Sequence, residues 1–159
     1  MKIKHIFRKN GSVSIYETLH LHLVFKDYIF LEACKKVPHE VANFLKGFLR
    51  GLDEPLCTKN LYPSFMGLTK DAYPERESRL NALNLCLARL PLLEKTTFGW
   101  LVIFIKVLLS YEAWSFMDLH NLALVFAPTL FFNTDRDPEE ELLTLETKVD
   151  LTKLYVQEP

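Results

Sequence analysis

The most hydrophobic stretch of the chain is FGWLVIFIKVLLSY, residues 98–111. A helix needs about 20 apolar residues to cross a bilayer, whereas this run is shorter and contains Lys106. Its apolar residues cover nearly every face of a helix, which indicates a helix at the centre of a folded domain. We therefore expect a helix over about residues 93–111, with the other elements packed around it.

Helical periodicity continues on both sides of this run, and no segment alternates with a period of two. The chain of 159 residues is 49% hydrophobic, which is enough for a core and too much for a disordered chain. We expect an all-α fold, a single helical domain over residues 1–159. The expected helices cover about 14–25, 38–53, 61–68, 74–90, 93–111, 115–127 and 138–156.

Apolar stripes predict which helix faces turn toward the core. The helix that starts at Pro38 has apolar residues at spacings of +4, +7 and +11, namely Val41, Leu45, Phe48 and Leu52. The helix over 74–90 has a similar stripe of Leu80, Leu83, Leu87 and Leu90.

Three local signals place helix boundaries in the second half of the chain. Ser115 and Asp118 have capping-box spacing, so we place a helix start at Ser115. That helix is expected to end at Ala127, because proline follows at 128. Asp137-Pro138, followed by three glutamates, is typical of a helix start.

Charge and cysteine content exclude several classes of protein. The net charge of -1 gives no overall attraction to nucleic acid or to an anionic membrane. The chain has three cysteines, an odd number, and they are far apart in sequence: Cys34, Cys57 and Cys86. This disfavours a disulfide framework or a zinc site. We expect reduced thiols in an intracellular protein.

No ordinary enzyme motif occurs in the sequence. It contains neither a P-loop nor a G-x-G-x-x-G loop, so nothing indicates a phosphate-binding site of its own. His20 and His22 are two residues apart and would point to different faces of a helix. The glutamates at 139–141 fit a solvated, dipole-stabilised helix start better than a catalytic cluster.

Three groups of polar residues are more informative. Arg8 follows two apolar residues in HIFRKNGS, residues 5–12, so that the apolar pair can anchor a loop while the arginine points outward. Lys46 and Arg50 are spaced i, i+4 and share a helix face. Asn121 lies within the apolar run HNLALVFAPTLF. Each group alone is better explained as ordinary solvated surface.

Taken together, four blocks of sequence are distinctive. They are IFRKNGS, VANFLKGFLRGLDEPLCT, RLNALNLCLARLP and MDLHNLALVFAPTLF, and they span about residues 6–131. Their content and order resemble the RhoGAP domain family, whose members stimulate GTP hydrolysis by Rho-family small GTPases. The resemblance implies a RhoGAP-like helical bundle, here lacking its first helices, followed by the C-terminal helix over about 138–156.

The resemblance also implies roles for particular residues. Arg8 would be the arginine finger that enters the partner's active site. Lys46 and Arg50 would support the arginine loop and the GTPase-facing surface, Asn121 would contact the GTPase, and Pro128 would be structural. The chain would then have no catalytic site, cofactor or metal of its own, because GTP and Mg²⁺ belong to the partner. That partner would be a Rho, Rac or Cdc42 protein, which would recruit this cytoplasmic chain to membranes.

The sequence departs from the family pattern in several places. His5 stands where the family usually has glycine, Asp53 replaces a proline, and Ala127 and Thr129 alter the block around Pro128. Family domains also carry helices before the arginine loop, whereas Met1 is seven residues before Arg8. Two alternatives follow: a catalytically impaired RhoGAP-fold module that binds a GTPase or competes with active relatives, and a helical scaffold without GTPase contact.

Overall fold

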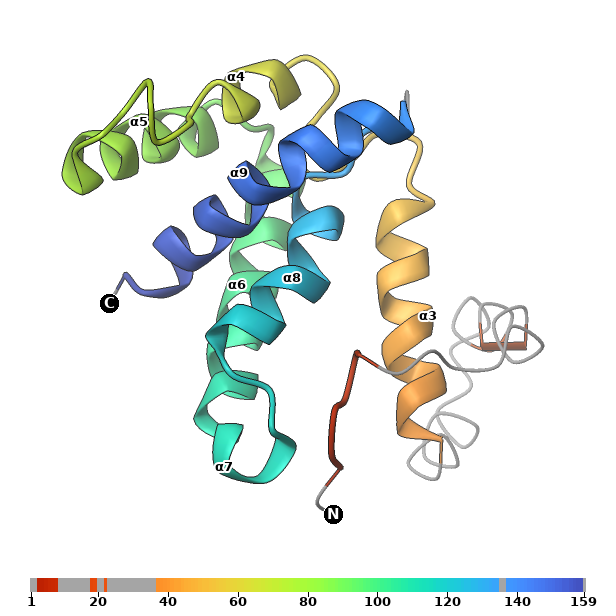
Figure 1. Ribbon diagram of the computed structural model, residues 1–159. Coiled ribbons are helices and arrows are strands. Elements are labelled where there is room, and N and C mark those ends of the chain that lie inside the picture. Colours follow the sequence, from red (N-terminus) through yellow and green to blue (C-terminus); the bar gives the residue numbers. More distant parts are fainter. Residues whose placement is uncertain (1–2, 9–17, 20–21, 23–36, 135–136, 159) are drawn as a thin grey trace.

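The computed structural model describes residues 3–8, 18–19, 22, 37–134 and 137–158, and its elements are drawn in Figure 1. The described part contains helices and no strand, so the all-α prediction is confirmed. The elements are α3 (Pro38–Arg50), α4 (Tyr62–Met66), α5 (Arg76–Ala88), α6 (Leu92–Ser110), α7 (Glu112–Ser115), α8 (Leu119–Leu130) and α9 (Pro138–Val156). None of the described helices is both long and apolar enough to cross a membrane.

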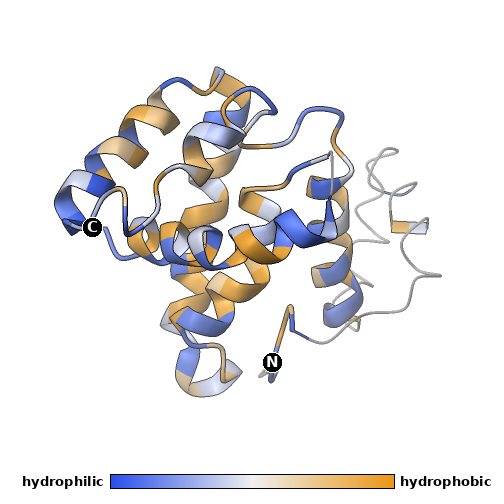
Figure 2. Ribbon diagram, turned by 45° about the horizontal axis from the view of Figure 1, so that its top comes forward, coloured by the Kyte–Doolittle hydropathy of each residue, from blue (hydrophilic) through white to orange (hydrophobic). Residues whose placement is uncertain are grey.

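Helix α8 is the most deeply buried helix of the core. It contacts α3, α6 and α9, which surround it in Figure 1. Leu122, Ala123, Phe126 and Ala127 are completely buried. Figure 2 shows that α6 and α8 are rich in hydrophobic residues, whereas α3 and α9 alternate between hydrophobic and hydrophilic faces.

The prediction that α6 is surrounded on all sides is wrong. Phe98, Leu101, Val102 and Ile105 are buried, but the opposite face of the helix remains exposed. That face carries Leu93, Trp100, Ile103 and Val107, each at least half exposed. The helix therefore forms one wall of the core, and only one of its sides is covered by the described residues. Hydrophobicity alone does not show how many sides of a helix are covered.

The predicted stripe of α3 is also shifted. The buried residues of the helix are Ala42, Phe44, Lys46 and Leu49, while Val41 is exposed. Leu45, Phe48 and Leu52 are half-buried against the main core. Phe44 instead packs with Leu19 in a separate small cluster. Because α3 contacts apolar residues on two sides, one stripe does not describe its burial.

The start and end of α8 differ from the prediction. Asp118, rather than Ser115, is the N-cap, and its Oδ1 accepts a hydrogen bond from the Asn121 N–H at 2.7 Å. Ser115 ends α7 and its hydroxyl accepts a bond from the Met117 N–H. Pro128 lies inside the helix, which continues to Leu130. A proline this near the end removes only one hydrogen bond, so the last turn can form around it.

Other helix predictions agree with the structure. The α9 helix begins at Pro138 after the Asp137 N-cap, as the sequence indicated. Leu83, Leu87 and Leu90 of the α5 stripe are buried, and Leu80 packs against them half-buried. Of the segment 14–25 the structure describes only Thr18, Leu19 and His22, which are helical; Ser14, His20 and Cys34 lie outside the described residues.

Candidate functional site

The Arg8 loop is a tight turn fixed by its aromatic residue. The Arg8 N–H donates to the His5 carbonyl at 3.2 Å, which closes a turn with Phe7 as its third residue. Phe7 has φ 70°, the sign that a type II turn requires at this position and that usually favours glycine. The Phe7 ring is buried against Phe126 and Phe104, with ring centroids 4.9 and 5.7 Å away. The turn thus directs Phe7 inward and leaves Arg8 exposed.

Lys46 fastens the same turn from α3. Its Nζ donates a 2.7 Å hydrogen bond to the carbonyl oxygen of Phe7, in a buried position. Burial lowers the pKa of Lys46 from its usual range, and the nearby positive charge of Arg50 lowers it further. Burying an ammonium group costs free energy unless it is hydrogen-bonded, so the bond to the Phe7 oxygen offsets part of that cost. The loop is therefore held both by its ring and by its backbone.

Arg50 acts at a different place from Lys46, although both lie on one side of α3. Its Nε donates to the Thr129 hydroxyl at 2.9 Å, which joins α3 to the last turn of α8. Pro128 lies directly before that threonine. Thr129 is completely buried and was not singled out by the sequence as a partner of Arg50.

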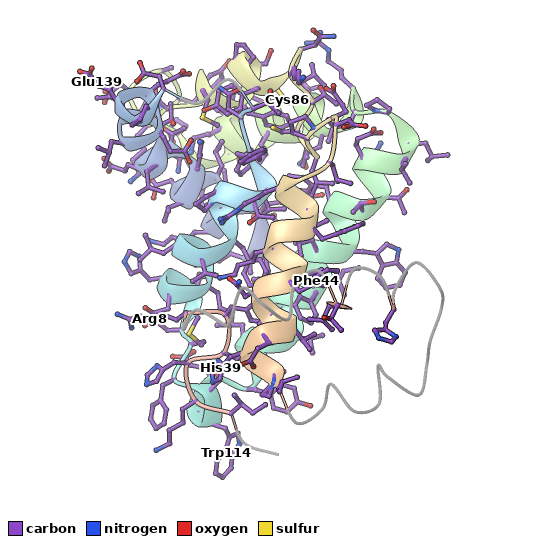
Figure 3. All side chains as sticks on the ribbon, turned by 90° about the vertical axis from the view of Figure 1, so that its right-hand side faces the viewer. Arg8, His39, Phe44, Cys86, Trp114 and Glu139 are labelled. Carbon is purple, nitrogen blue, oxygen red and sulfur yellow. The ribbon has the colours of Figure 1, made fainter. Side chains whose placement is uncertain are left out.

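Asn121 meets the Arg8 side chain. Its Oδ1 accepts a hydrogen bond from Arg8 Nη1 at 3.5 Å, across 113 residues of sequence. The Asn121 main chain is held by the Asp118 cap in the first turn of α8. In Figure 3 Arg8 projects outward from the helices, at the side opposite α6. The structure thus brings Arg8, Asn121 and Lys46 to one end of the molecule, with Arg50 further along α3.

Sequence reasoning missed two contributors to this site. His5 was noted only as a departure from the family glycine, and Phe116 was not noted at all. The His5 N–H donates to the Ser115 carbonyl at 2.7 Å, and its ring stacks on Phe116. Aromatic residues so far apart in sequence give no local signal of pairing.

The chemistry available at this end is that of an exposed guanidinium on a fixed loop. A guanidinium stays protonated and offers several donors in a rigid fork, which suits it to phosphate oxygens. Among the described residues no group of histidine, cysteine, aspartate and glutamate could hold a metal ion.

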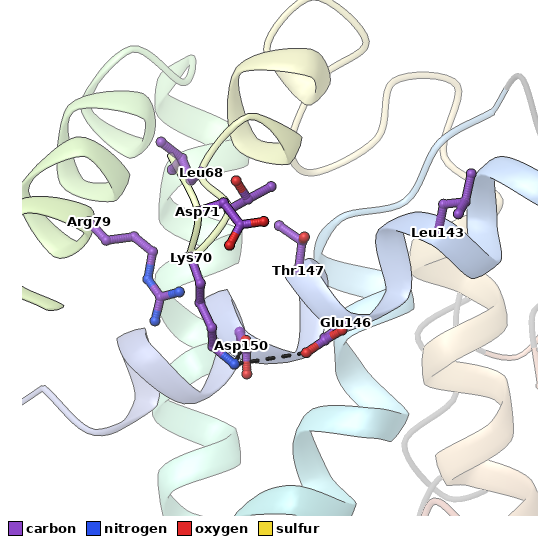
Figure 4. A pocket seen from close by; sticks show the side chains of 9 residues that line it. Leu68, Lys70, Asp71, Arg79, Leu143, Glu146, Thr147 and Asp150 are labelled. Atoms are coloured by element: carbon purple, nitrogen blue, oxygen red, sulfur yellow. Dashed lines mark ion pairs between the residues drawn. The ribbon is translucent and has the colours of Figure 1, made fainter. Parts of the chain in front are cut away.

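A cavity with several charged side chains lies away from the Arg8 loop. It has a volume of about 230 Å³ and is lined by α5, α9 and the loop at 68–71. Figure 4 shows its Lys70 side chain directed at two acidic residues of α9. Lys70 forms an ion pair with Asp150 and approaches Glu146 at 4.0 Å. Lys70 is thus paired with acidic side chains of α9 rather than left free to meet a ligand.

Fold and sequence now define the class of protein. The profile of the family described as "RhoGAP domain" matches residues 1–135. The chain belongs to this family.

Individual relatives give the same result. The Rho-type GTPase-activating protein 1 of Schizosaccharomyces pombe is 33% identical over 153 residues, covering 92% of this chain and 13% of that protein. The Rho GTPase-activating protein 40 of Mus musculus is 32% identical over 135 residues, covering 84% of this chain and 20% of that protein. The chain therefore spans a fifth or less of the length of these relatives.

Solved structures confirm the fold. Human Rho GTPase activating protein 15 superposes with a TM-score of 0.84 at 19% identity, covering 98% of this chain and 72% of that one. The BH domain from GRAF gives a TM-score of 0.75 at 18% identity, covering 98% and 81%.

Proposed function

We propose that this chain stimulates GTP hydrolysis by a Rho-family small GTPase, with Arg8 inserted into the partner's active site. The observation that carries the proposal is the placement of Arg8: an exposed guanidinium on a turn whose neighbouring residue is anchored by the aromatic core and by Lys46. Membership of the RhoGAP family supports a Rho-type GTPase as the partner.

An arginine suits this reaction for an electrostatic reason. Hydrolysis spreads negative charge over the phosphoryl oxygens and the leaving oxygen, and a guanidinium can bond to several of them at once. Arginine fingers are worth about 10³–10⁵ in rate, or roughly 4–7 kcal/mol of transition-state stabilisation. GTP and Mg²⁺ are supplied by the partner, and this chain contributes no cofactor.

The supporting residues take different parts in the proposal. Phe7 and Lys46 hold the turn, so that little ordering of the loop is needed when the partner binds. Asn121 keeps Arg8 near α8 before insertion and can then turn its amide to the GTPase. Arg50 braces α3 against α8, the two helices that carry these groups.

The experiment is a single-turnover assay with GTP-loaded Rho, Rac and Cdc42 proteins and an unrelated small GTPase. Saturating amounts of this chain should accelerate hydrolysis by at least one Rho-family member and leave the unrelated protein unchanged. Binding without acceleration would favour the impaired module, which competes with active relatives. Neither binding nor acceleration by folded protein would favour the helical scaffold and overturn the proposal.

A further inference from the structure

Backbone strain is concentrated around Arg8. Four non-glycine residues of the described part have positive φ. Two of them, His5 and Phe7, lie in the turn that ends at Arg8, and a third, Phe116, stacks on His5. Such conformations cost on the order of 1–3 kcal/mol and persist only where the surroundings hold them. For Phe7, the burial of its ring and the hydrogen bond from Lys46 to its carbonyl oxygen account for the positive φ. His5 and Phe116, both with φ 55°, need another explanation.

His5 and Phe116 hold one another. Their rings stack with centroids 5.9 Å apart and planes inclined by 29°. Lys4 Nζ lies 5.1 Å from the Phe116 ring centroid, so the ring is in contact with two residues of the arginine loop. The buried His5 Nδ1 has no hydrogen-bond partner among the described residues, so stacking rather than a bond from this nitrogen holds the imidazole.

The stack belongs to a closed circuit that includes Arg8. The His5 carbonyl accepts the Arg8 N–H at 3.2 Å. On the other side, Phe116 leads after one residue to Asp118, whose carboxylate caps α8 at Asn121. Asn121 in turn accepts the Arg8 side chain. A displacement of either ring therefore moves one end of the circuit relative to the other.

We propose that the His5–Phe116 stack is a positioning device that sets Arg8 relative to Asn121 for entry into the GTPase. The proposal rests on the proposed function, in which Arg8 is the inserted group. Glycine at position 5 would adopt the positive φ without strain or side-chain contact. In this chain the histidine accepts that strain and adds a ring contact that restricts the loop.

Asparagine substitutions separate the ring from the backbone. His5→Asn and Phe116→Asn remove one ring each, while asparagine tolerates the left-handed conformation. We expect each to lower the saturating single-turnover rate by about 10- to 100-fold, since an error near 1 Å can cost on the order of 10² in rate. Affinity for the GTPase loaded with a non-hydrolysable GTP analogue should stay within about twofold, because the rings act through Arg8.

The double variant and a control sharpen the test. Because the two rings act as a pair, the double variant should lose no more than either single variant. Tyr111→Ala is the control, since it removes an aromatic ring of similar exposure, 58% against 52% for Phe116, from the same end of the molecule. It should leave the rate unchanged. Thermal unfolding checks that each variant is folded. If one of the two single variants does not fold, the other is enough to test the positioning role.

The outcomes distinguish the two proposals. If folded His5→Asn and Phe116→Asn keep the parent rate while Arg8→Ala is inactive, the positioning role of the stack is overturned and the proposed function stands. A loss of affinity at an unchanged saturating rate would also overturn it, because the rings would then be contact surface. If Arg8→Ala itself retains full stimulation, the proposed function fails and the positioning role fails with it.

Discussion

The ammonium of Lys46 donates a 2.7 Å hydrogen bond to the main-chain oxygen of Phe7, the residue directly before Arg8. Thirty-nine residues separate the two partners, so this bond fixes the arginine loop to a helix distant in sequence. The bond joins the main chain of Phe7 to α3. The ring of Phe7 packs against Phe104 of α6 and Phe126 of α8.

Replacing Lys46 should affect activation more than stability. Lys46→Met leaves the Phe7 oxygen unbonded, at a cost of about 1–3 kcal/mol, but it also removes a buried charge whose pKa burial has lowered. These effects oppose one another, so we expect the free energy of unfolding in urea to change by less than about 2 kcal/mol. The stimulated rate should fall on the order of 10²-fold, because the loop is no longer fixed. Lys95→Met, at an exposed position of α6, is the control, and an equal loss there would contradict this role.

Two helix caps provide a matched pair. Asp118 and Asp137 cap α8 and α9, each through a side-chain bond to a main-chain N–H. Replacing either by alanine should lower the unfolding free energy by about 1 kcal/mol. Only Asp118→Ala should also lower GTPase stimulation, because its cap positions Asn121. Equal activity in the two variants would show that this cap serves stability alone.

The contact between Arg50 and Thr129 should be stabilising. Thr129→Val keeps the shape of the buried side chain and removes the oxygen that accepts from Arg50 Nε. Hydrogen bonds to charged groups contribute about 1.5–3 kcal/mol, so urea unfolding should show a loss of that order. Thr129→Ser retains the hydroxyl and should lose less. A valine variant as stable as the serine variant would contradict the assigned bond.

Cys57 should make stability fall at alkaline pH. Burial raises the pKa of its thiol from 9.0 to about 12, and the thiol is completely buried beside the Phe132 carbonyl. Above pH 9 the unfolded chain loses this proton while the folded chain keeps it, so stability declines as pH rises toward 12. By pH 10 the loss should be about 1.4 kcal/mol relative to pH 8.

Cys57→Ser isolates that effect, because serine does not ionise in this range. The difference in unfolding free energy between the parent chain and Cys57→Ser should shift by the same amount between pH 8 and 10. Cys86, whose thiol pKa burial also raises, is present in both proteins and cancels. A difference that stays constant with pH would contradict the burial of the Cys57 thiol.

Local sequence signals predicted most helices and the buried face of α5, but not the buried faces of α3 and α6. Pro38 and Asp137-Pro138 mark their helix starts because proline and the N-cap act within one turn. The exposed row on α6 could not be predicted, because periodicity does not show how many sides of an apolar helix are covered. Pro128 was read as a stop, although in the last turn it costs too little to end α8.

The sequence singled out several residues that the structure brings together, but not the contacts between them. Arg8, Lys46, Arg50 and Asn121 were identified through the resemblance of four sequence blocks, which carries family information. The Lys46 bond to a main-chain oxygen, the Arg50 bond to Thr129 and the His5–Phe116 stack depend on how distant segments meet. No spacing within one segment encodes them.

The most direct test of the account is the saturating single-turnover rate of GTP hydrolysis with Arg8→Ala. Arg89→Ala, which removes an exposed arginine at the end of α5, is the matched control. We predict that Arg8→Ala loses on the order of 10³–10⁵ in stimulated rate while still binding the GTPase, and that Arg89→Ala loses nothing. Stimulation by Arg8→Ala equal to that of the parent chain would contradict the account.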